Sequence, residues 1–78
     1  MTSQTLFQVV YSELARYPTF TYADGMDVGW RRVTRGDLVG EYHTGEKVYI
    51  PQDGMYVFPK GVSNIRVGKN LFTIAKEL

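Results

Sequence analysis

Turn-forming residues divide this chain into short segments, and their spacing limits its possible folds more than any other feature. From Trp30 to the C-terminus, glycine or proline interrupts each run of β-branched and aromatic residues after a few positions. β-branched and aromatic side chains suit the pleated backbone of a strand, whereas glycine, proline and aspartate favour turns. No segment after residue 18 shows helical periodicity. The pattern predicts an all-β domain of about seven short strands, arranged as a compact barrel or sandwich.

The expected strands lie between these turns. Residues 6–16 fit either a helical stripe or an alternating strand, and Val9-Val10-Tyr11 favours the strand. We expect a hairpin turn at His43-Thr44-Gly45-Glu46. A second turn is expected at Pro51-Gln52-Asp53-Gly54, where proline presets φ and Asp-Gly tolerates a positive φ. The other expected strands cover residues 19–23, 30–33, 38–42, 47–50, 55–58, 65–67 and 71–75.

The chain has 78 residues and no cysteine. This length fits one domain, and we expect residues 6–78 to form it, with residues 1–5 either disordered or marking the start of a fragment. Without disulfides or thiolate metal ligands, so small a domain must be held by its core, by a partner or by the rest of a longer chain. The absence of cysteine fits a reducing compartment, so we expect a cytoplasmic protein.

The charge balance argues against two classes of partner. The formal net charge is +1, which gives no strong field for nucleic acid or for an anionic membrane. The apolar runs are far shorter than the roughly 20 residues that span a bilayer. The N-terminus also lacks the basic-then-apolar order of a signal peptide. We therefore expect no nucleic-acid partner and no membrane partner.

Two segments of the sequence repeat one pattern. Val33-x-x-Gly36-Asp37-Leu38 and Ile65-x-x-Gly68-x-x-Leu71 each place a β-branched residue three positions before a glycine and a leucine shortly after it. We interpret each as an inward anchor, a sharp bend at glycine and an inward leucine that starts the next strand. Between them, Ile50-Pro51-x-x-Gly54 is a turn that can switch strands between two sheets. This ordered set resembles the barrel-sandwich hybrid, or hammerhead, of biotinyl and lipoyl carrier domains, and the resemblance implies that fold.

No residue pattern in this chain predicts a catalytic or metal centre. His43 is the only histidine, and neither a cysteine nor an His-x-x-Glu motif accompanies it. We therefore interpret His43 as a solvated turn residue rather than a metal ligand or a catalytic base. The carboxylates are scattered, and several lie beside glycine turns, where aspartate hydrogen-bonds its own backbone. We expect no catalytic residue, no bound cofactor and no metal ligand in this chain.

Two alternative functions depend on a few residues each. A free-standing biotinyl- or lipoyl-like carrier needs a modifiable lysine at a hairpin tip, and Lys47 lies beside the expected tip. Lys47 lacks the Met-Lys-Met or Asp-Lys-Ala context, so we interpret it as an exposed strand lysine that protects an edge. A protein-interaction module without a modified lysine is a variant of this alternative.

The other alternative is a small β-barrel that binds nucleic acid. Trp30-Arg31-Arg32 together with Arg35 can stack on and neutralise a single strand. We favour a different interpretation of this cluster, in which the tryptophan is buried and the stems of the flanking arginines cover it.

A wider resemblance extends over residues 6–76. It begins with residues 9–14, Phe20, Ala23-Asp24 and Val33-x-x-Gly36-Asp37-Leu38-Val39. The most specific segment, Tyr56-Val57-Phe58-Pro59-Lys60, comes next, followed by Ile65-x-Val67-Gly68-x-x-Leu71-Phe72. In this order they resemble the C-terminal domain of the succinylglutamate desuccinylase/aspartoacylase family. The family often has asparagine where this chain has Lys60. The tyrosine in the following loop of aspartoacylase-like members is not matched here.

The family resemblance implies a role without catalysis for this chain. Members are zinc hydrolases that cleave a linear amide C–N bond, and their zinc ligands lie in a carboxypeptidase-like N-terminal domain. The resemblance implies that this chain is the C-terminal domain of such an enzyme, with the zinc-binding domain of the same protein and a small N-acylated amino acid as partners. Charge-assisted hydrogen bonds from Arg66 or Lys60 to a substrate carboxylate would suit this role. The candidates for lining the substrate channel are Lys60, Ser63, Asn64 and Arg66.

Overall fold

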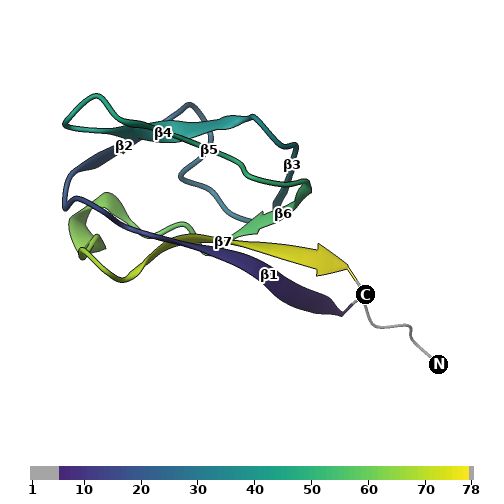
Figure 1. Cartoon of the computed structure of the whole chain (residues 1–78). Helices are drawn as coiled ribbons and strands as arrows, with labels where there is room; N and C mark the ends of the chain where they lie inside the picture. Colours follow the sequence, from purple (N-terminus) through teal and green to yellow (C-terminus); the bar gives the residue numbers. More distant parts are fainter. Residues whose placement is uncertain (1–5, 78) are drawn as a thin grey trace.

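Two antiparallel sheets make up the fold in this computed structural model, which describes residues 6–77 (Figure 1). The larger sheet has the order β1-β7-β6-β3 and the smaller one β2-β4-β5. The predicted all-β class and strand number are confirmed, and the expectation for residues 1–5 lies outside the described residues. The strands are β1 (Phe7–Leu14), β2 (Phe20–Tyr22), β3 (Arg31–Val33), β4 (Leu38–Tyr42), β5 (Lys47–Tyr49), β6 (Gly54–Val57) and β7 (Asn70–Glu77), with the 3-10 turn η1 (Val62–Asn64) between β6 and β7.

The ambiguous N-terminal segment is a strand, because it pairs with the C-terminal end of the chain. β1 runs antiparallel to β7 from Phe7 opposite Glu77 to Leu14 opposite Asn70. β7 therefore lies between β1 and β6, and residues 71–75 are all buried. Both edges of β7 are thus paired, and Thr73 is the one polar residue in a central run that is otherwise apolar.

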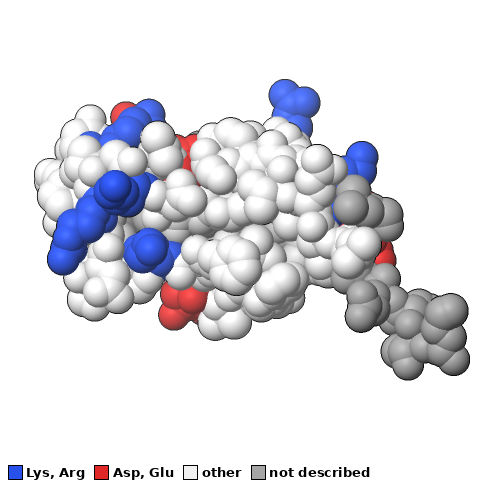
Figure 2. Space-filling view, turned by 90° about the horizontal axis from the view of Figure 1, so that it is seen from below, with Lys and Arg blue, Asp and Glu red and all other residues white. Residues whose placement is uncertain are grey.

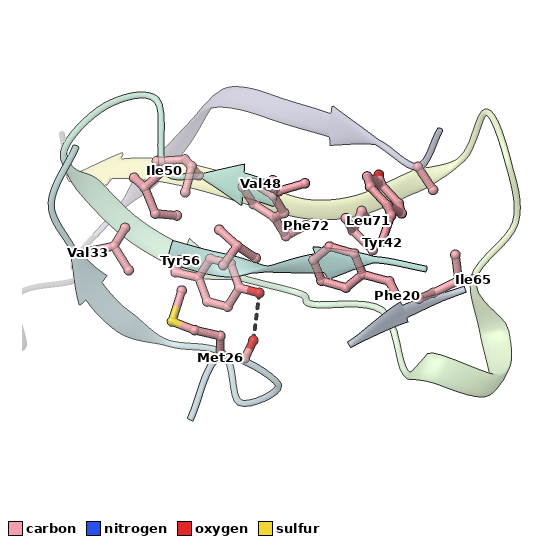
Figure 3. Close-up of a cluster of buried hydrophobic side chains, with 13 residues drawn as sticks. Phe20, Met26, Val33, Tyr42, Val48, Ile50, Tyr56, Ile65, Leu71 and Phe72 are labelled. Carbon is pink, nitrogen blue, oxygen red and sulfur yellow. Dashed lines mark hydrogen bonds between the residues drawn. The ribbon is translucent and has the colours of Figure 1, made fainter. Parts of the chain in front are cut away.

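One predicted strand, residues 65–67, is wrong. η1 precedes this segment, and Ile65 inserts its buried side chain into the core beside Phe20 (Figure 3). The chain then turns at once, and the Lys69 N–H donates to the Arg66 carbonyl over 3.0 Å. With one inward side chain and then a tight turn, the segment is too short to pair with another strand. The prediction was wrong because a β-branched residue before glycine is also typical of a strand end.

Aromatic side chains from both sheets meet in the core (Figure 3). Phe20 contacts Tyr42 edge-to-face with ring centroids 5.0 Å apart, and Tyr56 lies 5.3 Å from Phe72. The Tyr56 hydroxyl donates to the Met26 carbonyl over 2.6 Å, so this buried polar group is satisfied. Each ring pair lies within one sheet, the two sheets share one hydrophobic core, and the Tyr56 hydrogen bond ties the larger sheet to the loop after β2.

The repeated sequence pattern folds into two equivalent bends. Gly36 and Gly68 both adopt positive φ, at 95° and 85°, where an L-residue is strained. The Gly36 N–H donates to Ile50 O over 2.8 Å, and the Gly68 N–H donates to Ala15 O over 2.9 Å. Each acceptor residue returns a hydrogen bond to the residue after the glycine, from Ile50 to Asp37 and from Ala15 to Lys69. The two bends thus share one backbone hydrogen-bond pattern.

The strands that follow the bends also match in register. β4 pairs with β5 through a bulge between Leu38 and Gly40, and β7 pairs with β1 through a shift at the corresponding position. One detail of the predicted repeat is wrong, because Leu38 is 39% exposed while Leu71 is fully buried. Val39, at the bulge, takes the inward position that Leu71 has in the second half, because the bulged residue turns its side chain toward the core.

Candidate functional site

The four residues predicted to line a substrate channel lie on the connection between β6 and β7. Lys60, Ser63, Asn64 and Arg66 are all exposed, and η1 holds two of them. The Arg66 guanidinium donates to the Ile65 carbonyl over 3.1 Å. Within residues 6–77, no hydrogen bond joins the four side chains to one another. The structure therefore places them on one exposed loop, without an assembled polar site.

Backbone hydrogen bonds fix this loop to the rest of the domain at Lys60. The Lys60 N–H donates to Leu71 O over 2.8 Å, and the Lys60 carbonyl accepts from the Tyr22 hydroxyl over 2.6 Å. Burial raises the pKa of Tyr22 to about 12, so its hydroxyl keeps the proton that it donates at neutral pH. With Ile65 in the core, the loop is tied down at both ends, so its polar side chains project from a fixed backbone.

The loop belongs to the most basic part of the chain. Residues 54–76 contain no aspartate or glutamate. Figure 2 shows lysine and arginine gathered toward the end of the molecule that η1 occupies in Figure 1. A shallow hollow next to η1 is lined by Tyr22, Val62 and two carboxylates, Asp24 and Asp27. Because those carboxylates repel an anion, the exposed cations of the loop, rather than the hollow, suit a carboxylate ligand.

The hairpin between β4 and β5 forms where it was expected. The Tyr42 N–H donates to Glu46 O over 2.9 Å, and His43 lies exposed in the turn with its ring against Tyr17. Lys47 is exposed on the edge strand β5, and its ammonium is 3.7 Å from the Glu41 carboxylate. Lys47 therefore occupies a paired position on a strand and not the tip of the turn.

Neither a metal-binding group nor a membrane-spanning helix is present within residues 6–77. No group of three or more histidine, aspartate or glutamate side chains is placed to hold a metal ion. In the same residues there is no helix with the length and apolar character needed to cross a bilayer.

An exposed aromatic cluster is the feature that sequence reasoning missed. Phe7, Trp30 and Phe58 lie far apart in the sequence, yet the Trp30 ring centroid is 5.7 Å from that of each phenylalanine. Trp30 is 58% exposed and Phe58 is 64% exposed, so the expectation of a buried tryptophan covered by arginine stems is wrong. Arg31 donates instead to the Gly25 carbonyl over 3.1 Å. We call these three residues the aromatic cluster.

Backbone strain coincides with this cluster. Trp30 and Phe58 are the two non-glycine residues with positive φ within residues 6–77, at 59° and 54°. Bulky side chains rarely adopt this conformation, and each instance costs on the order of 1–3 kcal/mol. A close approach helps to hold it, because a Cβ on Gly29 would lie only 3.0 Å from Pro59 Cδ. No local sequence signal could have revealed Phe58, since a residue before proline ordinarily favours extended backbone.

Comparison of the chain with protein-family models, with curated proteins and with solved structures finds no match.

Proposed function

We propose that this chain is a barrel-sandwich hybrid domain, and that it acts as the non-catalytic C-terminal domain of a cytoplasmic, zinc-dependent amidohydrolase of the succinylglutamate desuccinylase/aspartoacylase type. The observation that carries the proposal is the equivalence of the bends at Gly36 and Gly68. Matching hydrogen bonds and matching bulges support two related half-units around one interior, which is the organisation that the ordered motif set implies.

In this role the chain supplies shape and charge, and the chemistry takes place elsewhere in the enzyme. The zinc ion belongs to an N-terminal catalytic domain of the same protein, and this domain packs against it. Lys60, Ser63, Asn64 and Arg66 face the substrate channel, where the carboxylate of a small N-acylated amino acid binds. Their exposure on a fixed loop within an acid-free segment supports this assignment.

The test is purification from the native host with a tag at the C-terminus of this chain. We expect the tagged protein to be joined to a zinc-containing polypeptide that hydrolyses N-acylated amino acids, with activity lost on chelation and restored by zinc. Intact mass should show no biotinyl or lipoyl adduct on Lys47. A free 78-residue species without hydrolase activity would contradict the proposal, and an adduct would favour the carrier alternative.

Substitution at the loop tests the channel assignment in the same material. A hydrogen bond to a charged group contributes about 1.5–3 kcal/mol, so Lys60→Ala and Arg66→Ala should raise KM about 10- to 100-fold with little change in kcat. Lys47→Ala is the matched control, because this exposed lysine lies in the other sheet. Equal kinetics for the loop variants and the control would remove these residues from the channel.

A further inference from the structure

The aromatic cluster covers the outer face of the four-stranded sheet. Val57 and Ala75 are buried, yet neither belongs to the central core shared by the two sheets. Side chains alternate along a strand, and Tyr56 and Ile74, which precede them, point inward. Val57 and Ala75 therefore point outward, and the Trp30 N–H donates to Tyr56 O over 2.7 Å, which sets the indole beside β6. The rings form a partial apolar layer over this face.

This layer is incomplete, and its rings stay open to solvent. Phe7 is 36% exposed, in addition to the larger exposed fractions of Trp30 and Phe58, and Val9 on the same face is also exposed. The surface seen from the side of β1 and β7 is mostly uncharged outside its basic end (Figure 2). Arg32, at the margin, is balanced by Glu77, whose carboxylate is 3.9 Å from its guanidinium. An apolar face with a balanced rim is typical of a protein contact.

The ring geometry argues against stacked bases as the occupant. Bases stack on flat ring faces that lie open in a row. Here the rings meet edge-to-face, with interplanar angles of 67° and 82°, and both phenylalanines pack against the indole. Arg31 is also engaged with the Gly25 carbonyl. The cluster therefore forms an uneven apolar surface, which suits contact with the side chains of a folded protein.

The size and position of the cluster distinguish between two protein partners. An aromatic side chain carries about 150–250 Å² of surface, so three rings exposed by one third to two thirds present roughly 300 Å². A stable complex of separate chains uses about 800 Å² from each partner. Contacts between domains of one chain begin at about 600 Å² in total, which is roughly 300 Å² from each domain and matches the cluster. Phe7 is also the first residue of β1, so a domain preceding this one would enter beside the cluster.

We propose that the aromatic cluster, formed by Phe7, Trp30 and Phe58, is the surface on which the N-terminal domain of the same protein docks. This inference rests on the proposed function and assigns its interface to one face of one sheet. The strained backbone at Trp30 and Phe58 fits this role, because it holds two large rings outward where folding alone gains little from them.

Single cysteines in this cysteine-free sequence test the assignment in the tagged protein from the native host. Phe58→Cys and, as the control, Tyr49→Cys are labelled with a maleimide, and the labelled peptides are quantified by mass spectrometry. Tyr49 is 52% exposed on β5, in the other sheet. We expect both thiols to react in the isolated 78-residue chain, and only the thiol at 49 to react fully in the native protein.

Truncation of the ring supplies a second measurement. Removing a central interface aromatic costs about 2 kcal/mol or more, so Phe58→Gly should weaken association of the separately produced domains about 30-fold. Phe58→Tyr, which retains the ring, should bind almost as the native chain does. Glycine also accepts the positive φ, so the melting temperature of the isolated Phe58→Gly chain should stay close to the native value.

The outcomes separate this inference from the proposed function. Equal labelling of positions 58 and 49 in a protein that has zinc-dependent hydrolase activity would overturn the docking face and leave the proposed function intact. Protection at 58 that appears only on self-association of the chain would assign the face to a second copy and overturn the inference. Protection at 58 by a covalently joined domain without hydrolase activity would support the docking face and contradict the proposed function.

Discussion

The half-unit that bends at Gly36 and the half-unit that bends at Gly68 use the same backbone frame with different side chains. In the first, Gly40 and Tyr42 occupy the inward positions of β4, whereas the corresponding positions of β7 hold Phe72 and Ile74. The aromatic ring is therefore at the second of these positions in β4 (Tyr42) and at the first in β7 (Phe72). Backbone hydrogen bonds therefore set the repeat, and the core is filled by distributing side-chain volume between the halves and not by repeating the same residues.

The two halves also differ in how their paired strands end. β4 and β5 are joined by the turn at His43, whereas β7 and β1 pair in the matching register without a turn between them. The acidic residues are distributed unequally as well, since residues 54–76 have none. The second half therefore carries the cationic loop, and substitutions at matching positions test how far the equivalence of the halves extends.

Phe72→Ala should produce the largest effect, because Phe72 fills the position at which β4 has Gly40. We expect a loss of about 3–5 kcal/mol in the free energy of unfolding, since truncating a buried phenylalanine leaves a cavity. Urea unfolding followed by circular dichroism measures it. Leu38→Ala, on the exposed face of β4, is the control and should stay within about 0.5 kcal/mol of the native chain. Similar losses for the two variants would contradict the proposed division of volume.

Gly40→Ala should be the next most damaging change. A Cβ at position 40 would lie 2.3 Å from the Thr21 carbonyl oxygen and 2.6 Å from Phe20 Cζ, and the backbone oxygen cannot move without disturbing β2. We expect a loss of about 3 kcal/mol from overpacking, measured by thermal unfolding. Gly61→Ala is the matched control, because its Cβ would meet nothing closer than 3.5 Å. A Gly40→Ala chain as stable as the control would show that Phe20 and β2 can retreat.

Gly36→Ala and Gly68→Ala test the equivalence of the bends directly. At both positions φ is positive and a Cβ would meet no neighbouring atom, so the cost comes from the backbone alone. Each variant should lose about 1–2 kcal/mol, and the double variant should lose the sum, because the bends are separate. Chemical unfolding of the three variants decides the point. A clear cost at one glycine and none at the other would break the two-half description.

Tyr22→Phe should have the smallest effect, because it removes one hydrogen bond between the halves. We expect a loss of about 1 kcal/mol at neutral pH. The folded pKa of Tyr22 is about 12 against an ordinary value of 10.0, so the unfolded chain releases the proton first. The contribution of Tyr22 to the free energy of unfolding is complete below pH 10 and declines as the pH rises toward 12. Between pH 8 and 12 the free energy of unfolding should fall less steeply with pH in the variant than in the native chain. An equal slope for the two proteins would contradict this pKa.

Much of the backbone could be predicted because turn chemistry is local. Glycine at 36 and 68, Gly45 in the hairpin turn and the alternation in β5 each act within a few residues of sequence. The positive φ expected at Asp53-Gly54 is absent, because Gly54 already belongs to β6. The prediction of a strand over residues 65–67 was wrong, because one β-branched anchor is compatible both with a strand and with a single inward side chain. The prediction that Leu38 faces inward was wrong, because a bulge changes which residue faces the core. The position of the bulge depends on the partner strand.

The exposed loop that carries the candidate residues was predictable from the sequence, whereas the contacts that hold it were not. The loop with Lys60 and Arg66 is exposed where it was expected, and its ties to Leu71 and Tyr22 connect residues remote in sequence. Trp30 was expected to be buried, because large aromatic residues usually are. Its environment depends on a strained backbone and on two phenylalanines, one from β1 and one from the segment after β6.

By itself the sequence determined the all-β class, the bends at Gly36 and Gly68, the hairpin at His43 and the scarcity of groups for catalysis, because each depends on residue type and on near neighbours. Only the tertiary structure decided that β1 pairs with β7, that Gly40 gives space to Phe20, and that Phe7, Trp30 and Phe58 meet on one face. These features join distant segments, and the free energy that selects them comes from packing and ladder hydrogen bonds that exist only when the chain is folded.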